Sequence, residues 1–417
     1  MLPDHPPYSQ AIPILMAMFD KALLIASLAF PVAGSAQTLR DAAAAAYARN
    51  PQLLAAEARG DEVRARRVQA DAWLAGPPAL SLGQRTDRPL ANAGKREFEV
   101  EVAAPLWLPG QRGAQQELVA AEAAENELEV VALRLQVAGE LRDAIWALRA
   151  ADAERELAFG RSDSARQLEQ EVARRVSAGD LARSDLLLAQ GERLAAEAAE
   201  LEAGNRVAQA MQRYSLLTGF ATLPADAEEP RRDAAPTEAA APDHPRIEAG
   251  RRALARAQSN LQAVQGASRD APELTVQYQR GRDDFDSPTR DNVRVGIRIP
   301  FGTEARNRPL VAAANTEIVK AHAELSAAEA AVAAELRDAR TGLANAERAA
   351  ALADQRRAAA AENLRLTRKG FDLGELPLAQ LLRAQAQAQE AEAARTLQKT
   401  AVALAVARLN QAQGLLP

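Results

Sequence analysis

The side chains that could do chemistry in this 417-residue chain are few and widely spaced. The histidines are His5, His244 and His322, and there is no cysteine. No two histidines have a spacing such as H-x-x-x-H, which would place both on one helix face as metal ligands. The many Glu and Arg residues lie in Ala-rich stretches, where solvated faces and i,i+4 pairs are usual. We therefore expect no catalytic residue, no cofactor and no metal site, and a protein that is not an enzyme.

Four short stretches alternate between apolar and polar residues: 79–85, 97–103, 273–279 and 292–299. Period-two alternation places the two kinds of side chain on opposite faces of a strand. Their length is close to the 9–11 residues of a tilted membrane-crossing strand. If the apolar face meets lipid, the other face lines water. The predicted lipid-facing residues are Phe98, Val100, Val102, Leu274, Val276, Tyr278, Val293, Val295, Ile297 and Ile299. The predicted lumen-facing residues are Glu97, Glu99, Glu101, Glu273, Arg294 and Arg298.

A single alternating strand is equally typical of an antiparallel sheet that covers a soluble core. The rest of the chain argues against that interpretation, because it offers no obvious core. Alanine dominates the hydrophobic residues, and aromatic residues make up only 4% of the chain. Such a composition favours long, closely packed helices. The net charge of −5, with both signs interspersed, gives no basic surface for nucleic acid.

The chain repeats itself once at an offset of about 195 residues. The segment Glu140-Leu141-Arg142-Asp143-Ala144 returns at 335–339 as Glu-Leu-Arg-Asp-Ala, and Gly179-Asp180-Leu181 returns at 374–376 as Gly-Glu-Leu. Such self-similarity predicts two copies of one unit. We place them at 37–220 and 244–417, joined by a Pro- and Ala-rich linker at 221–243. The predicted helices are 39–74, 112–176 and 183–217 in the first copy, and 245–268, 304–371 and 377–413 in the second.

The N-terminus has the features of a cleaved signal peptide. Lys21 precedes an apolar run at 22–32, and small residues at 33–36 precede the expected cleavage after Ala36. The Pro-rich start is unlike a signal peptide, so we expect translation to begin at Met18 or Met16.

The predicted fold class is mainly α with a small β part: long tandem-repeat helical hairpins plus four strands per protomer. Helices of about 65 residues would be roughly 100 Å long. Four strands cannot close a water-filled barrel, and an open sheet edge cannot face lipid. Three copies would supply twelve strands, enough for a channel, so we predict a homotrimer. Trp107 is expected either at the membrane interface or buried, and Trp73 and Trp146 in helix packing.

The order of these features resembles the TolC-like outer membrane efflux family over essentially all of 37–417. The residues that carry the resemblance are Pro105-Leu106-Trp107-Leu108-Pro109-Gly110-Gln111-Arg112 and Ile299-Pro300-Phe301-Gly302 at strand exits, and the turns at 175–185 and 369–376. The resemblance implies a trimeric tunnel in a Gram-negative bacterium. A 12-stranded barrel in the outer membrane would continue as a periplasmic α-helical barrel. The closed end would meet a periplasmic adaptor and, through it, an inner-membrane pump of the resistance-nodulation-division type.

The resemblance also assigns a docking and gating tip to residues of the two turns. They are Val176, Gly179, Asp185, Phe371, Gly374, Gln380 and Arg383. Gly179 and Gly374 match the family's tip glycines, and Asp185 matches an acidic residue that helps to hold the entrance shut. Gln380 and Arg383 stand where acidic residues can ring the pore, so an acidic constriction is in doubt.

Two further questions stay open at this point. The short chain and its Leu-Trp-Leu-Pro-Gly-Gln-Arg strand exit look most like the branch that exports heavy metals of the cobalt-zinc-cadmium type, with drug or organic-solvent export as the competitor. The alternative to a channel is a soluble periplasmic coiled-coil scaffold or adaptor protein.

Overall fold

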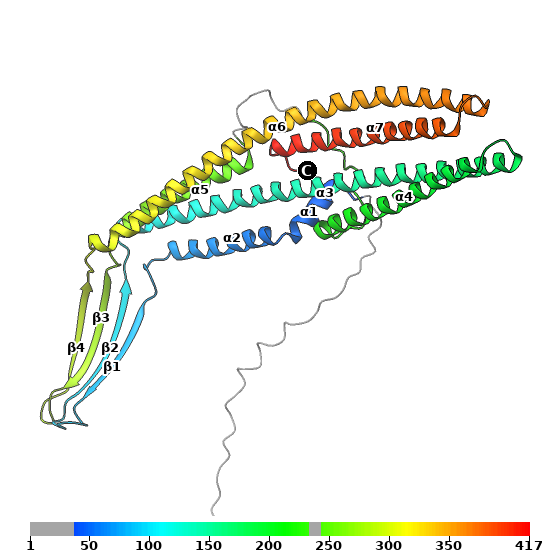
Figure 1. Ribbon diagram of the computed structural model, residues 1–417. Coiled ribbons are helices and arrows are strands. Elements are labelled where there is room, and N and C mark those ends of the chain that lie inside the picture. The colour runs from blue at the N-terminus through cyan, green and yellow to red at the C-terminus, as the bar shows by residue number, and fades with distance from the viewer. Residues whose placement is uncertain (1–36, 233–242) are drawn as a thin grey trace, which may run out of the picture.

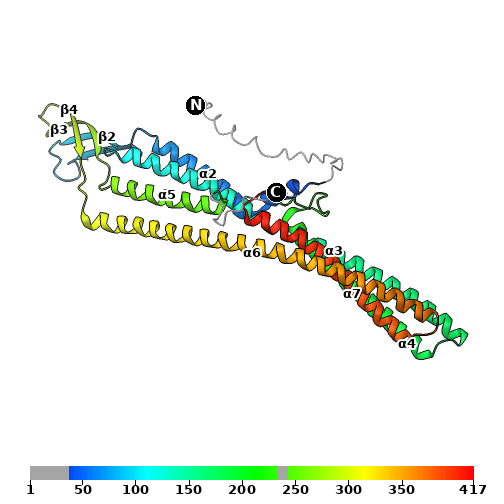
Figure 2. The same ribbon diagram turned by 90° about the horizontal axis from the view of Figure 1, so that it is seen from above.

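The computed structural model describes residues 37–232 and 243–417 (Figure 1). The predicted signal peptide and part of the predicted linker lie outside these residues. The described chain is a long assembly of helices with one small sheet at its end (Figures 1 and 2). None of the described helices is both long enough and apolar enough to cross a membrane.

The elements follow one another twice in nearly the same order. The first series is α1 (Leu39–Arg49), α2 (Pro51–Ala70), β1 (Ala79–Thr86), β2 (Arg96–Pro105), α3 (Gln111–Ala178) and α4 (Arg183–Thr218). The second series is α5 (Pro245–Gly266), β3 (Glu273–Arg282), β4 (Arg290–Arg298), α6 (Glu304–Asp372) and α7 (Leu378–Ala412). The predicted fold class, mainly α with four strands, is confirmed.

The long helices α3 and α6 have 68 and 69 residues. At 1.5 Å per residue each is roughly 100 Å long. Shorter helices lie end to end beside them: α2 and α4 beside α3, and α5 and α7 beside α6 (Figure 1).

The prediction of one helix over 39–74 is wrong in two respects. The chain breaks at Asn50, whose backbone is extended and whose side chain accepts hydrogen bonds from the N–H groups of Gln52 and Leu53. Proline at 51 explains the break, because it disfavours helical geometry in the residue before it and suits the first position of a new helix. The second helix then ends at Ala70, ahead of a turn that leads into β1.

The four strands form one antiparallel sheet in the order β1-β2-β3-β4. The central pair, β2 with β3, joins the two halves of the chain. β1 and β4 each have a partner on one side only, so the sheet has two open edges.

The helices lie side by side in an order that matches that of the strands (Figure 1). α3 packs against α2 and α4 on one side and against α5 and α7 on the other, and α5 and α7 also pack against α6. The two edges of the helical layer are therefore α2 with α4, and α6. α4 meets α3 through fully buried alanines, which permit a close approach: Ala189, Ala196 and Ala203.

The three tryptophans have different environments. Trp146 is buried on α3, as expected for helix packing. Trp107 is half-buried, and its indole N–H donates to the carbonyl oxygen of Ala72 at 3.0 Å. Trp73 was expected to pack between helices, but it lies in the turn between α2 and β1 and is 91% exposed. The reason is the early end of α2, which leaves Trp73 outside any helix.

Candidate channel wall and tip

The register of the sheet places apolar side chains of all four strands on one face. Val100 lies opposite Leu82 on one side and Tyr278 on the other, and Tyr278 lies opposite Val293. Side chains directly opposite each other in antiparallel strands share a face. The predicted lipid-facing residues in the strands therefore lie together, and Leu80 and Leu82 of β1 join them. Ile299 lies one residue beyond the end of β4.

This apolar face is not covered by any other described element. Leu80, Val293 and Val295 are 65%, 71% and 67% exposed. An ordinary sheet in water would bury such a face against a core. The exposure indicates that the face has a partner outside the single chain.

The opposite face carries the predicted lumen residues, and some of them form ion pairs with the neighbouring strand. Glu97 of β2 lies 3.3 Å from Arg85 of β1 and 3.4 Å from Lys95. Glu273 of β3 lies 3.5 Å from Arg298 of β4. Glu99 accepts a hydrogen bond from the amide of Gln279 at 3.3 Å. The face is thus polar, with acidic residues on the two central strands and cations on the outer ones.

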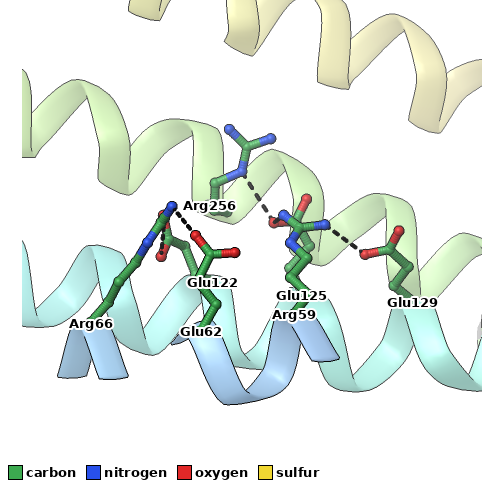
Figure 3. Close-up of polar contacts among 7 residues, drawn as sticks. All are labelled: Arg59, Glu62, Arg66, Glu122, Glu125, Glu129 and Arg256. Atoms are coloured by element: carbon green, nitrogen blue, oxygen red, sulfur yellow. Dashed lines mark hydrogen bonds and ion pairs between the residues drawn. The ribbon is translucent and has the colours of Figure 1, made fainter. Parts of the chain in front are cut away.

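In the helices that lead to the sheet, a charged cluster joins α2, α3 and α5 (Figure 3). Arg59 of α2 lies 2.8 Å from Glu129 and 3.6 Å from Glu125, both on α3. Arg256 of α5 approaches the same Glu125 to 3.2 Å. A hydrogen bond from Arg66 to Glu122 raises the pKa of Arg66. Glu125 therefore ties the two halves of the chain together.

At the far end of the molecule, both helical hairpins turn in the same way. Gly179 and Gly374 follow α3 and α6 with φ angles of +86° and +76°, a left-handed conformation that glycine adopts without strain. Asp180 donates its backbone N–H to Arg175, and Glu375 donates its own to Gly370, each at 2.9 Å. These bonds close a Schellman motif at each helix end. A Cβ at either glycine would meet no other atom within 4 Å, so both turns are open to the outside.

An apolar core joins the two hairpins just behind these turns. Its centre is Phe371, which is 2% exposed. The other buried members come from both hairpins: Leu168, Val172, Ala189, Leu378 and Leu381. Val176, one of the predicted tip residues, packs against this core.

Four charged side chains cross the same junction, and we call them the tip quartet: Glu171 and Arg175 of α3 with Arg368 and Asp372 of α6. Arg175 lies 3.1 Å from Glu171 and 3.5 Å from Asp372. Arg368 lies 3.3 Å from Asp372 and also pairs with Glu171. The Arg175 guanidinium sits 4.8 Å from the centre of the Phe371 ring. Each carboxylate is therefore shared between the two hairpins.

Sequence reasoning missed the tip quartet. Its only signal was the i,i+4 spacing of a carboxylate and an arginine on each helix, which recurs throughout this chain. The contact across the hairpins joins residues 197 positions apart, as in the pair Glu171 and Arg368.

The remaining predicted tip residues take up different positions. Asp185 is half-buried, and its carboxylate accepts the backbone N–H of Ala182 at 3.2 Å, at the start of α4. Gln380 and Arg383 are exposed on the first turns of α7. Within the described part of the chain, Arg383 makes no ion pair. A groove between the turns is lined by Arg175, Asp180, Leu181, Asp185 and residues 371–378.

The described residues contain no group of three or more acidic or histidine side chains arranged to hold a metal ion. His244 is buried at the start of α5, where its Nδ1 accepts the backbone N–H of Arg246 at 3.2 Å. His322 is exposed on α6.

Comparison with known proteins shows what the chain is similar to. Residues 42–219 match the model of a family described as outer membrane efflux protein. The first of the two halves of the chain is therefore similar to outer membrane efflux proteins. Family members are channels, and they work as trimers with adaptors and inner-membrane pumps.

Solved structures of outer membrane proteins share the fold of this chain. A structure of CusC, described in relation to transmembrane channel formation, has a TM-score of 0.76 and 18% identity, covering 91% of this chain and 92% of that one. The outer membrane protein VceC of Vibrio cholerae gives 0.70 and 18%, covering 90% and 96%. The open state of the MtrE channel of Neisseria gonorrhoeae gives 0.72 and 18%, covering 90% and 89%. No curated protein matches this chain.

Proposed function

We propose that this chain is an outer membrane efflux protein, three copies of which form a passive exit duct that receives cargo from an inner-membrane pump through a periplasmic adaptor. The two units that build each copy are residues 37–220 and 244–417. No residue of the duct acts as a catalyst. The observation that carries the proposal is the four-stranded sheet, with one apolar exposed face, one charged face and two unpaired edges.

Lipid accounts for all three properties of the sheet. An unpaired strand edge in hydrocarbon leaves backbone groups without hydrogen bonds, so the sheet must close. Pairing β1 of one copy with β4 of the next closes twelve strands around a water-filled space. The apolar face, which includes Phe98 and Ile297, then meets lipid. The lumen is lined by Glu97, Glu99, Glu101, Glu273, Arg294 and Arg298. Trp73 and Phe301, 91% and 88% exposed at the helical end of the sheet, suit the membrane interface.

The tip is the proposed gate and adaptor site. Exposed ion pairs contribute about 0.2–1 kcal/mol each and are screened by salt. Burying an aromatic ring such as Phe371 contributes about 1.5–3 kcal/mol. The apolar core therefore holds the two hairpins together, while the tip quartet sets their alignment. An adaptor that docks in the groove beside Gly374 could favour a separated arrangement of the hairpins.

The test replaces the tip glycines. Gly179→Val and Gly374→Val force a β-branched residue into a left-handed conformation, so both turns should change shape and adaptor binding and export should fall. Gly113→Val is the matched control, because Gly113 is a helical glycine far from the tip with open space around it. Trimers should persist in all three variants, as native mass spectrometry in detergent can show. Unchanged export by both tip variants would overturn the assignment of the tip as the gate. A purified protein that stays dispersed without detergent would indicate a soluble scaffold instead of a channel.

The cargo is tested separately. From the sequence we expect heavy-metal cations, with drugs or organic solvents as the competing class. A strain that lacks this chain should become sensitive to the class that it exports. The metal branch would be supported if the strain became sensitive to cobalt, zinc or cadmium and the intact gene restored its resistance. Sensitivity to drugs alone would contradict it.

A further inference from the structure

The apolar face of the sheet becomes basic at the end where loops join the strands, away from the helices (Figure 1). On β3, Tyr278 is followed on the same face by Arg280 and Arg282, because alternate residues of a strand point the same way. On β2, Arg96 precedes Phe98 on that face. The register places Arg96 directly opposite Arg282, and Phe98 directly opposite Arg280. We call Arg96, Arg280 and Arg282 the rim arginines.

Two of the rim arginines are open to the surroundings of the sheet. The Arg280 side chain is 62% exposed, and its Nε lies 3.6 Å from the carboxylate of Asp291 on β4. The same carboxylate accepts a hydrogen bond from the Tyr278 hydroxyl at 2.8 Å. Arg96 is exposed and makes no ion pair with any residue that the structure describes. The single carboxylate of Asp291 is thus already shared, and the rim keeps a positive charge.

The third rim arginine is held in place by the loops. The Nε of Arg282 donates to the carbonyl oxygen of Gly94 at 3.1 Å, and its guanidinium lies 5.5 Å from the centre of the Phe285 ring. The loop residue Asp284 also interacts with Arg282, but its carboxylate already accepts two backbone N–H groups of its own loop. Arg282 is therefore fixed opposite Arg96, although like charges in that arrangement repel each other.

The position of the rim arginines indicates what they meet. A charge on the lipid side of a barrel is costly at the bilayer midplane, and the cost nearly vanishes at the interfaces. The rim arginines therefore belong at the level of the lipid headgroups. Tyr278 suits the boundary just below them, because its ring is apolar and its hydroxyl is hydrogen-bonded. A phosphate can accept paired hydrogen bonds from a guanidinium, and between Arg96 and Arg282 it would remove their repulsion.

We propose that the rim arginines bind the phosphate groups of the glycolipid in the outer leaflet of the outer membrane. This inference rests on the proposed function, which directs the loops to the outside. Residues directly opposite each other have Cβ atoms about 5 Å apart, and alternate residues lie about 7 Å apart along a strand. One phosphate can therefore reach two of the three arginines. All three belong to β2 and β3, the central pair of strands, so each copy of the chain holds a complete site.

The test compares two matched double variants of the full exported protein in detergent. Arg96→Gln with Arg280→Gln removes one unpaired and one ion-paired arginine from the rim and keeps Arg282, which contacts the loops. Arg85→Gln with Arg294→Gln removes the same two kinds of arginine from the polar face, where Arg85 pairs with a glutamate and Arg294 is exposed. The probe is lipid A, a phosphorylated glycolipid, and native mass spectrometry counts the bound molecules. The rim variant should bind lipid A about tenfold more weakly than the wild type, and the polar-face variant as tightly as the wild type.

Two further probes identify the source of the phosphate. Lipid A stripped of its phosphates should bind the wild type no better than intact lipid A binds the rim variant. Inorganic phosphate at the same phosphate concentration should not displace lipid A. Tight binding of the stripped lipid would overturn the role of the phosphates, and displacement by inorganic phosphate would overturn the lipid as the occupant.

The outcomes separate this inference from the proposed function. If trimers form in detergent but the rim variant binds lipid A as tightly as the wild type, the rim site is overturned and the duct stands. An equal loss of binding in the polar-face variant would overturn the rim site as well. A protein that is monomeric in detergent would overturn the proposed function itself.

Discussion

The effect of a substitution in the sheet depends on the face that the residue occupies. Val100 lies in the middle of the apolar face, opposite Leu82 and Tyr278. Val100→Arg would place a charge in hydrocarbon at a cost of about 2–4 kcal/mol near the midplane. We expect a much lower yield of assembled trimers, measured by native electrophoresis after membrane extraction. Gln277→Arg is the control, because Gln277 lies on the polar face of the neighbouring strand. Equal assembly of the two variants would contradict the assignment of the faces.

His244 should make the protein sensitive to mild acid. Burial lowers the pKa of His244, with nearby Arg246 as the second cause, while Glu335 opposes the shift. Its contribution to stability is complete above the unfolded pKa of about 6.5 and is lost as the pH falls through the lower folded pKa. Chemical unfolding at pH 7 and at pH 5 should show this loss.

His244→Asn is the matched variant, because Asn50 caps α2 at the equivalent place in the first half of the chain. The variant keeps a cap but does not titrate, so its stability should fall less between the two pH values. An equal loss in both proteins would show that other groups cause the acid sensitivity.

At the scale of elements, one buried arginine joins α3 to the linker and to α7. The Arg142 side chain is 2% exposed and lies 2.6 Å from Glu229. It also donates to the carbonyl oxygen of Leu415 at 3.0 Å and to the side chain of Gln411. Arg142→Ala leaves the Glu229 carboxylate buried without its charge partner, which costs about 3–5 kcal/mol.

Urea unfolding in detergent should measure this loss. The control is Arg337→Ala at the repeat-related position, where the arginine is exposed on α6. Similar stabilities for the two variants would show that the buried pair does not hold these elements together.

The tip offers a second test at this scale. Phe371→Ala removes the ring at the centre of the core between the hairpins, a change that costs about 3–5 kcal/mol when the site cannot collapse. We expect the closed tip to loosen and the conductance of the reconstituted channel to rise without an adaptor. Leu373→Ala in the same turn is the control, since Leu373 is 64% exposed. An unchanged conductance in Phe371→Ala would show that this core does not hold the entrance closed.

At the scale of the whole assembly, the threefold symmetry of the proposed trimer would repeat each charge near the entrance three times. Arg383 is exposed and makes no ion pair within the described chain. Three such arginines around one axis would disfavour cations. Arg383→Asp should therefore shift the reversal potential of the channel in a salt gradient toward cation selectivity, while Arg383→Lys should leave it nearly unchanged. No shift in the Asp variant would place Arg383 away from the narrowest part of the pore.

The sequence by itself determined the features that depend on local backbone geometry. Strict alternation at 97–102 sets the two faces of a strand whatever surrounds it. The length of α3 follows from a stretch without proline, and α6 contains a proline, Pro309, only near its start. The two-copy pattern was visible for the same reason, because equal local structures need similar local residues. The break at Pro51 was also a local signal, and it was overlooked.

The tertiary structure alone decided which distant segments meet. Nothing local to Glu171 indicates that it pairs with Arg368, nor that Trp73 lies in an exposed turn at the end of the sheet. Alanines and leucines at heptad spacing on α4 look equally suitable as a packing face, and only the folded chain shows that the alanines are buried and the leucines are not. The reason is that packing depends on which surfaces remain free after all helices are placed, and that is a property of the complete arrangement.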